Sequence, residues 1–243
     1  KETLESTIHN KLLDLFKKYL LTGGLPDAIN SFINDRNIFN IRKIQSDIYD
    51  YYGDGASKYD KDHRLKIKRI YDLIPSNLED KKKRVVVKNI ENIKGKRFSN
   101  YQNEFDFLIN SGIALEVKAI STPVFPLIES SGKNLLKLYL NDVGLLSNIL
   151  YKTNIKAILN DEKSINLGTV YESVVASKLK AHGHNLFYYD NKANGEVDFL
   201  IDDYDTLSFL PLELKSGKNY TIHSAINNFL SNKSYNVKQG IVL

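Results

Sequence analysis

The chain has 243 residues, of which 42% are hydrophobic and 26% are charged, and its formal net charge is +5 at pH 7. This composition is typical of a globular protein with a sizeable core, in one elaborated domain or two. No stretch approaches the roughly 18 apolar residues of a membrane span, and the first ten residues do not resemble a signal peptide, so we expect a cytoplasmic protein outside the membrane. The absence of cysteine excludes disulfides, thiolate metal sites and cysteine nucleophiles.

Apolar residues at helical spacing predict a mostly helical N-terminal part. The stripe over 12–20 predicts a helix that stops at Gly23, and Pro26 predicts the start of the next helix. Further helices are predicted over 38–52, 62–74 and 98–110, with strands over 84–90 and 112–120.

Basic side chains gather in the stretch 81–97, which holds one acid, Glu91. Its cations are Lys81, Lys82, Lys83, Arg84, Lys88, Lys94, Lys96 and Arg97. Such a run indicates either a nucleic-acid contact surface, with DNA as the favoured partner, or a solvated loop. Helices followed by a short sheet, with this basic turn between them, also suit a winged-helix-like module over 1–121.

A connecting segment is predicted over 122–165, where Pro123 and Pro126 interrupt regular structure. Within it, residues 136–146 predict a strand that runs into a helix, and Asp142 is placed to cap the start of that helix. We expect the boundary between two domains in this segment, with a nuclease-like core over 166–243.

The last part of the chain alternates helices and strands. We predict a helix over 167–182, strands over 185–190, 196–202 and 209–215, a helix over 222–231 and a strand over 237–243. The predicted fold class is α/β, or α+β overall, with an N-terminal helical part followed by a mixed β-sheet flanked by helices.

Two of these strands carry a pattern of charges that points to metal chemistry. Asp198 lies on one strand and Glu213-Leu214-Lys215 on the next, so a hairpin places both acids and the lysine at one end of a sheet. Alternation puts Glu213 and Lys215 on one face while Leu214 points into the core. Mg²⁺ prefers one or two carboxylates plus water and phosphate oxygens, and a nearby lysine can orient the attacking water. The alternative is a solvated face with a cross-strand ion pair.

The chain repeats the Glu-x-Lys pattern at Glu116 and Lys118. That copy has no acidic strand before it, because Asp106 falls in a predicted helix. We therefore expect residues 116 and 118 on a surface strand without a catalytic role.

The order Glu172 on a helix, Asp198 on a strand and Glu213-x-Lys215 on the next strand resembles the PD-(D/E)XK nuclease superfamily, whose restriction-endonuclease-like core runs helix, three strands, helix, strand. The resemblance implies that Asp198 and Glu213 bind Mg²⁺ or Mn²⁺ with the backbone carbonyl of Leu214. It implies that Lys215 positions the attacking water, and that Glu172 completes the metal shell or acts through water.

One position departs from that pattern. Val197 stands before the aspartate, where the superfamily often has proline. The departure is small, since this position varies within the superfamily.

Three motifs together widen the resemblance. They begin at Tyr19 (Tyr-Leu-Leu-Thr-Gly-Gly-Leu-Pro), at Lys137 (Lys-Leu-Tyr-Leu-Asn-Asp-Val-Gly-Leu-Leu) and at Gly195 (Gly-Glu-Val-Asp-Phe). With the Glu213 motif they look like a family of archaeal and bacterial AAA+ ATPases that carry an uncharacterised region after the ATPase domain. The resemblance implies that the missing ATPase domain is a partner and that the full-length protein can form oligomers.

The ATPase domain itself is absent from this sequence. Gly132-Lys133 and Gly217-Lys218 both lack the preceding glycine and the following Ser or Thr of a phosphate-binding loop, so ATP is not expected as a ligand. The chain has no methionine and stops within a predicted strand, at the C-terminal end of the nuclease-like core. Both features predict a piece of a larger protein.

Three histidines are weaker candidates. His182 and His184 have a spacing that suits a transition metal if one strand presents both, but Gly183 between them favours a turn that ends a helix. His223 is expected at a helix start near the Glu-x-Lys strand, as a surface residue or a supporting residue of the site.

Two functions therefore remain open from the sequence. The first is a metal-dependent nuclease domain. The second is a catalytically inactive module that binds nucleic acid or protein and regulates the ATPase. Metal binding at the acids distinguishes the two.

Overall fold

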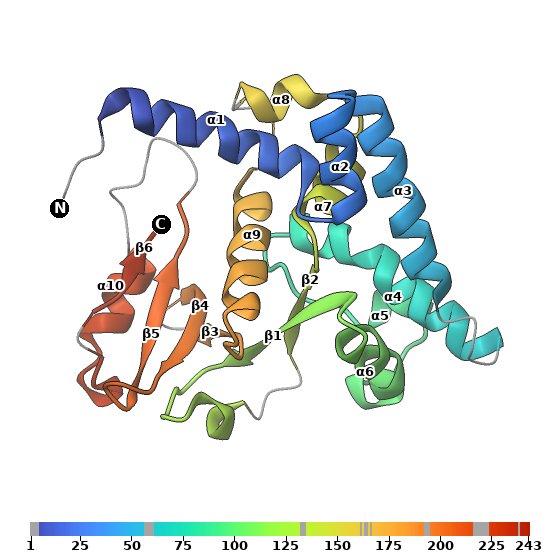
Figure 1. Cartoon of the computed structure of the whole chain (residues 1–243). Helices are drawn as coiled ribbons and strands as arrows, with labels where there is room; N and C mark the ends of the chain where they lie inside the picture. The colour runs from blue at the N-terminus through green and yellow to red at the C-terminus, as the bar shows by residue number, and fades with distance from the viewer. Residues whose placement is uncertain are drawn as a thin grey trace.

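The computed structural model describes residues 5–55, 61–131, 135–160, 162, 165, 167–191, 195–215, 224–237 and 239–243. A group of helices lies beside one six-stranded mixed sheet, and α9 packs between them (Figure 1). The predicted fold class is thereby confirmed.

Four helices open the chain, at α1 (Ser6–Thr22), α2 (Pro26–Asn34), α3 (Ile38–Asp54) and α4 (Lys61–Glu79). The predicted stop at Gly23 is confirmed: its φ of 73° lies in the region that favours glycine, and its N–H caps the helix through the carbonyl of Tyr19. Pro26 is the first residue of α2, where its missing N–H costs nothing. Helix α4 runs past the predicted end and contains Pro75.

The segment after α4 was expected to be a strand over 84–90, and this is wrong. It is irregular until α5 (Lys88–Glu91), and only Val85 joins the sheet, through a 3.0 Å hydrogen bond from its N–H to the carbonyl of Leu136. The helix predicted over 98–110 begins as a 3-10 turn, Phe98–Tyr101, and continues as α6 (Gln102–Asn110).

The sheet has the strand order β2-β1-β3-β4-β5-β6. Its members are β1 (Ala114–Ile120), β2 (Leu136–Leu140), β3 (Phe187–Asn191), β4 (Gly195–Asp203), β5 (Ser208–Glu213) and β6 (Ile241–Val242). The β1·β3 and β5·β6 pairs are parallel, and the other three are antiparallel.

Of the two strands expected in the winged-helix-like module over 1–121, the one that forms is β1, and it lies between β2 and β3. The sheet therefore continues across the boundary expected in 121–166, and the division into domains stays a prediction. The expectation that Glu116 and Lys118 lie on a surface strand is wrong, because β1 lies between β2 and β3 and most of its residues are buried. Each side chain is half-buried, and the two form an ion pair of 3.3 Å with each other.

The two faces of the sheet pack against different helices. Helix α9 (Leu167–Ala181) contributes Ala176 to the larger core, together with Phe199 and Leu212 of the sheet. Helix α10 (Ser224–Ser231) covers the other face, where Phe229 packs with Leu200. The order α9, β3, β4, β5, α10, β6 follows the order predicted for residues 167–243.

Two further helices join the halves of the structure. Asp142 caps α7 (Val143–Tyr151) as predicted, by accepting hydrogen bonds from the N–H groups of Gly144 and Leu145. Helix α7 contacts α1, α3 and α9, and α8 (Ile155–Leu159) contacts α1. Within the described residues, no helix combines the length and the apolar character needed to cross a membrane.

Candidate functional site

A β-bulge positions Asp198 on β4. Phe187 pairs with Leu200 and Tyr189 pairs with Val197, so β4 has one extra residue between these two pairs compared with β3. Val197 and Leu200 both belong to the core on the α10 side, which leaves Asp198 and Phe199 between them for the α9 side. The bulge therefore turns the Asp198 carboxylate toward helix α9.

Glu172 faces Asp198 from α9 and is almost fully buried, with 4% of its surface exposed. Both of its carboxylate oxygens accept hydrogen bonds inside the protein. Oε1 accepts from the ammonium of Lys83, and Oε2 accepts from the hydroxyl of Tyr139 at 3.0 Å. Thr169, one turn earlier on α9, donates to the carbonyl of Leu78 at 3.1 Å, so α9 is fixed against the end of α4.

Strand β2 brings two more polar side chains to this site. Lys137 is completely buried, its ammonium lies 4.5 Å from the ring centre of Tyr188, and it contacts Glu196 Oε1 at 2.5 Å without the geometry of a hydrogen bond. Tyr139, two residues later, donates to Glu172. Both lie on a strand whose other residues are leucines, so the only charge on β2 points at the acids.

The electrostatics of the site follow from burial and from crowding of negative charge. Burial and, second, the charge of Glu172 raise the pKa of Asp198 to about 7, while Lys137 and Lys83 act in the opposite direction. Burial and the charges of Glu172, Asp198 and Glu196 raise the pKa of the Tyr139 hydroxyl well above its usual value. Three acids therefore surround one hydroxyl, with two lysines beside them.

Glu213 and Lys215 form a separate pair at the end of β5, with Glu213 Oε1 and Lys215 Nζ 2.5 Å apart. Leu212 and Leu214 pack toward the α9 side, so alternation places Glu213 on the other face. The link to Asp198 is the N–H of Leu214, which donates to Asp198 Oδ2 at 2.7 Å. The second oxygen of Glu213 is buried and has no hydrogen-bond partner among the described residues.

An open groove of about 480 Å³ runs beside Asp198. The residues along it are Lys81, Lys82, Lys83, Asp190, Asn191, Gly195, Glu196 and Asp198. Part of the basic segment thus lies against the acids, although the two are far apart in the sequence. Arg84 reaches the same region and donates to Asp190 Oδ2 at 3.2 Å.

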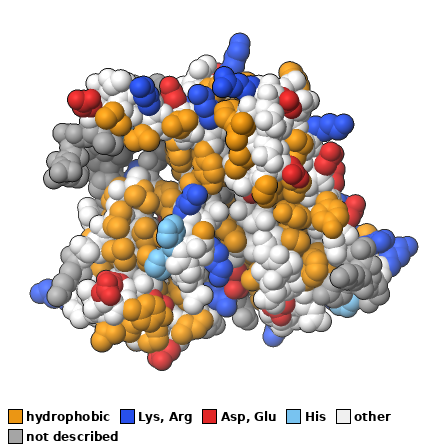
Figure 2. All heavy atoms as spheres, in the orientation of Figure 1, with side chains coloured by type: hydrophobic (Ala, Val, Ile, Leu, Met, Phe, Trp, Pro, Cys, Tyr) orange, Lys and Arg blue, Asp and Glu red, His pale blue; other side chains and the backbone are white. Residues whose placement is uncertain are grey.

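The other basic residues of the segment, Lys88, Lys94, Lys96 and Arg97, are exposed and do not line this groove. On the face shown in Figure 2, Lys and Arg side chains are spread out rather than gathered in one patch. Within the basic segment, residues 81–84 are therefore the ones that lie beside the acidic side chains of the candidate site.

The structure thus brings Glu172 together with Asp198, and Glu213 together with Lys215. It connects the two pairs through the backbone of Leu214, whose carbonyl stays a predicted ligand. Within the part of the chain that the structure describes, no three His, Asp or Glu side chains are arranged to hold a metal ion. The facing carboxylates of Glu172 and Asp198 nevertheless fit the one or two carboxylates that Mg²⁺ or Mn²⁺ takes. The side chain of Glu213 lies on the other face of the sheet from this pair.

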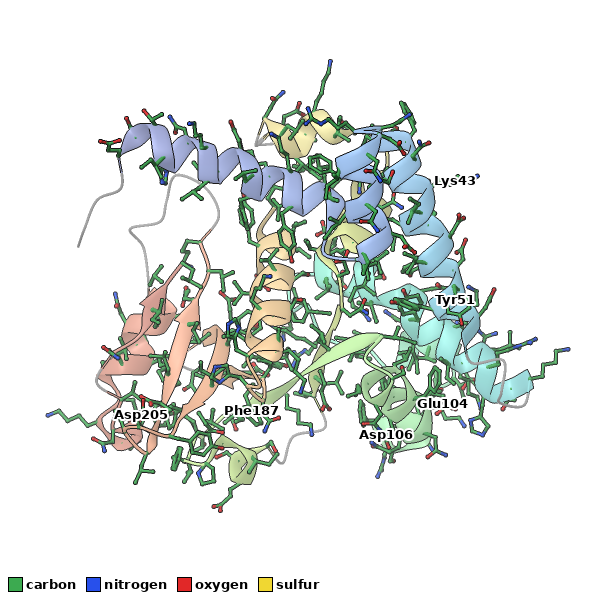
Figure 3. The ribbon with its side chains drawn as sticks, in the orientation of Figure 1. Lys43, Tyr51, Glu104, Asp106, Phe187 and Asp205 are labelled. Carbon is green, nitrogen blue, oxygen red and sulfur yellow. The ribbon has the colours of Figure 1, made fainter. Side chains whose placement is uncertain are left out.

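Among the remaining candidate residues, the structure describes His182, His184 and Asp106. His182 ends α9 in a turn, with Nδ1 2.7 Å from the carbonyl of Lys178 and Gly183 at a φ of 86°, as the turn interpretation predicts. His223 lies outside the described residues. Asp106 lies on α6, as predicted, on the far side of the molecule from β4 (Figure 3).

Sequence reasoning missed Lys137 and Tyr139 as members of the site, and it treated Lys83 only as part of a basic run. A signal existed for Lys137, because it is a single charge within the otherwise apolar strand Leu136–Leu140. No local pattern predicts that Lys83 meets Glu172, since the two are 89 positions apart.

The comparisons with known proteins find two families. Residues 13–156 match a domain of unknown function, DUF8612, and residues 167–243 match another, DUF4143, which is common in AAA-ATPase-associated proteins. No curated protein matches the chain, and neither does any solved structure.

Proposed function

For this chain, which belongs to the DUF8612 family and carries a DUF4143 region, we propose a metal-dependent phosphodiesterase site that acts on nucleic acid within an ATPase-associated protein. The observation that carries the proposal is the buried Glu172 facing the half-buried Asp198, beside a groove lined by three consecutive lysines. The order of elements over 167–243 and the positions of the acids on α9, β4 and β5 also agree with what the nuclease resemblance implies.

The chain's own residues supply binding and orientation. Lys81 and Lys82 are exposed along the groove and would contact backbone phosphates of the substrate. Asp198 and Glu172 would hold Mg²⁺ or Mn²⁺. Lys215, kept in place by Glu213, would orient the attacking water.

A bound divalent cation supplies stabilisation of the charge that develops on the phosphate. The protein contributes a fixed backbone around it. The bulge in β4 aims Asp198, and the Leu214 N–H holds one of its oxygens at 2.7 Å. Phosphate binding at the lysines then sets which bond of the substrate lies next to the carboxylates.

Cleavage assays test this proposal. Labelled single-stranded DNA, double-stranded DNA and RNA are incubated with the chain in Mg²⁺ or Mn²⁺. We expect Asp198→Asn and Lys215→Met to lower the rate at least about 100-fold, because each removes a group that acts in the transition state. Asp205→Asn is the matched control, since Asp205 lies on the exposed turn between β4 and β5 (Figure 3). Cleavage that survives both substitutions would sink the proposal.

A second function is favoured by one observation. Both oxygens of Glu172 already accept hydrogen bonds from within the protein, as expected of an acid with a structural role. On this view the region is an inactive module that binds nucleic acid or protein and regulates the ATPase. Binding of DNA that is equal in wild type and Asp198→Asn, with cleavage in neither, would favour the regulatory module.

A further inference from the structure

Lys83 contacts Glu172 and lies close enough to Asp198 for its charge to act on that carboxyl group. Its ammonium donates to Glu172 Oε1, and its charge also opposes the raised pKa of Asp198. One ammonium therefore offsets part of the negative charge of both carboxylates. Lys83 comes from the DUF8612 region, whereas both acids come from the DUF4143 region.

The backbone around Lys83 is built to aim this side chain. Lys83 has a φ of 49°, in the left-handed region that residues other than glycine rarely adopt. Its N–H closes a turn onto the carbonyl of Asp80 at 3.0 Å, and two residues later the N–H of Val85 bonds to Leu136 of β2 at 3.0 Å. These two hydrogen bonds fix the backbone at Lys83 and at Val85. The Lys83 side chain therefore extends toward Glu172 from a constrained backbone.

We infer that Lys83 is an internal cation that competes with a divalent metal ion for the Glu172 and Asp198 carboxylates, so that metal binding releases Lys83 into the groove. This inference rests on the proposed function, because it takes the same acids as metal ligands. It adds a residue from outside the nuclease-like core to the site.

Release changes what the groove offers to a ligand. Lys81 and Lys82 are exposed along it, and Lys83 is held back against Glu172. Once displaced, its ammonium would lie beside the metal ion with no carboxylate partner, and a phosphate group is the ligand that suits both cations. In this exchange, the acids would bind the metal ion and the lysine would bind the phosphate group.

Mn²⁺ binding measured by electron paramagnetic resonance on the whole chain tests the competition. We expect Lys83→Met to bind Mn²⁺ about tenfold more tightly than wild type, which corresponds to about 1.4 kcal/mol. Lys82→Met is the matched control, because it removes the same charge from the neighbouring exposed position. Its effect should be much smaller than that of Lys83→Met.

Equal affinities in wild type and Lys83→Met overturn the inference, and so does a complete lack of Mn²⁺ binding by both. The proposed function fails separately, by the cleavage assay. Chains that bind Mn²⁺ equally with and without Lys83 and still cleave nucleic acid would leave that function standing without the competition.

A second measurement uses wild type alone and does not depend on a variant that folds. Lysines are labelled with an amine-reactive acetylating reagent, with and without Mn²⁺, and each site is quantified by mass spectrometry. Lys83 should become several-fold more reactive when Mn²⁺ is added, while Lys82 stays unchanged. No rise at Lys83 under conditions in which Mn²⁺ is bound overturns the inference.

Discussion

The backbone N–H of Gly24 donates a 2.6 Å hydrogen bond to the Asp142 carboxylate, across 118 positions of the chain. The other oxygen of Asp142 accepts from Gly144 and Leu145 at the start of α7. One carboxylate thus joins the first two helices to the helix that follows β2. It also brings two of the sequence motifs, Gly-Gly-Leu-Pro and Asn-Asp-Val-Gly, into direct contact.

Asp142→Ala should lower the free energy of unfolding by about 3 kcal/mol. The substitution removes a helix cap and also the acceptor of the partly buried hydrogen bond from the Gly24 N–H. Urea unfolding gives the value. Asn37→Ala is the control, because Asn37 caps α3 through one exposed hydrogen bond and should cost only about 1 kcal/mol. Equal losses for the two variants would contradict the joining role of Asp142.

Gly23→Ala should also destabilise the protein, by more than about 2 kcal/mol. A Cβ at this position would lie 2.1 Å from Asp142 Oδ1, and the φ of 73° already disfavours any residue but glycine. Gly55→Ala is the matched control, since its φ of −59° suits alanine and, among the described residues, nothing lies within 4 Å of the added carbon. Thermal unfolding should show a large fall in Tm for the first variant and almost none for the second.

Asp198 gives the stability a pH dependence. The unfolded chain loses this proton near pH 4, its ordinary range, but the folded protein keeps it until about pH 7 because of burial and the charge of Glu172. The contribution to stability is therefore complete below pH 4 and is lost as pH rises to 7. We expect the loss to be on the order of 2 to 4 kcal/mol.

Asp198→Asn should remove that part of the pH dependence, since an amide does not ionise and its oxygen can still accept from Leu214. Urea unfolding at several values between pH 4 and 8 measures the slope. Asp205→Asn serves as the exposed control and should keep the slope of wild type. A wild-type slope in Asp198→Asn would show that Asp198 is not the group that titrates.

Lys137 and Glu196 should respond unequally to substitution. Glu196→Gln leaves a completely buried ammonium without its partner, which should cost about 3 kcal/mol. Lys137→Met removes the buried charge and keeps an apolar chain of similar length, while Glu196 is 33% exposed and stays in contact with water. We expect that variant to lose less than about 1 kcal/mol, and equal losses in urea unfolding would contradict this account.

Much of the fold was predictable from local pattern. The helical stripes, the Gly23 stop and the cap at Asp142 were visible because each depends on residues a few positions apart. Strands β3, β4 and β5 were also predicted, although each observed end differs from the predicted one by up to two residues. The strand expected over 84–90 failed because one backbone bond from Val85 to β2 does not make a strand.

The arrangement of the site was less accessible. Alternation alone placed Asp198 and Glu213 on a shared site, but the bulge between Val197 and Leu200 turns Asp198 toward α9. A bulge of this kind depends on how β3 and β4 pair, which a single strand does not reveal. The meeting of Lys83 with Glu172 depends on the packing of α4 against the sheet and on α9, and no spacing in the chain encodes it directly.

Asp198 is the ligand on which the proposed metal site depends most. Crystals of the chain grown with a short DNA oligonucleotide and soaked in Mn²⁺ would show the metal directly by its anomalous scattering. We predict a peak bonded to the Asp198 carboxylate, beside the groove at Lys81, Lys82 and Lys83. A map in which DNA is bound but no Mn²⁺ lies on Asp198 would contradict the metal-dependent site and leave the regulatory module in its place.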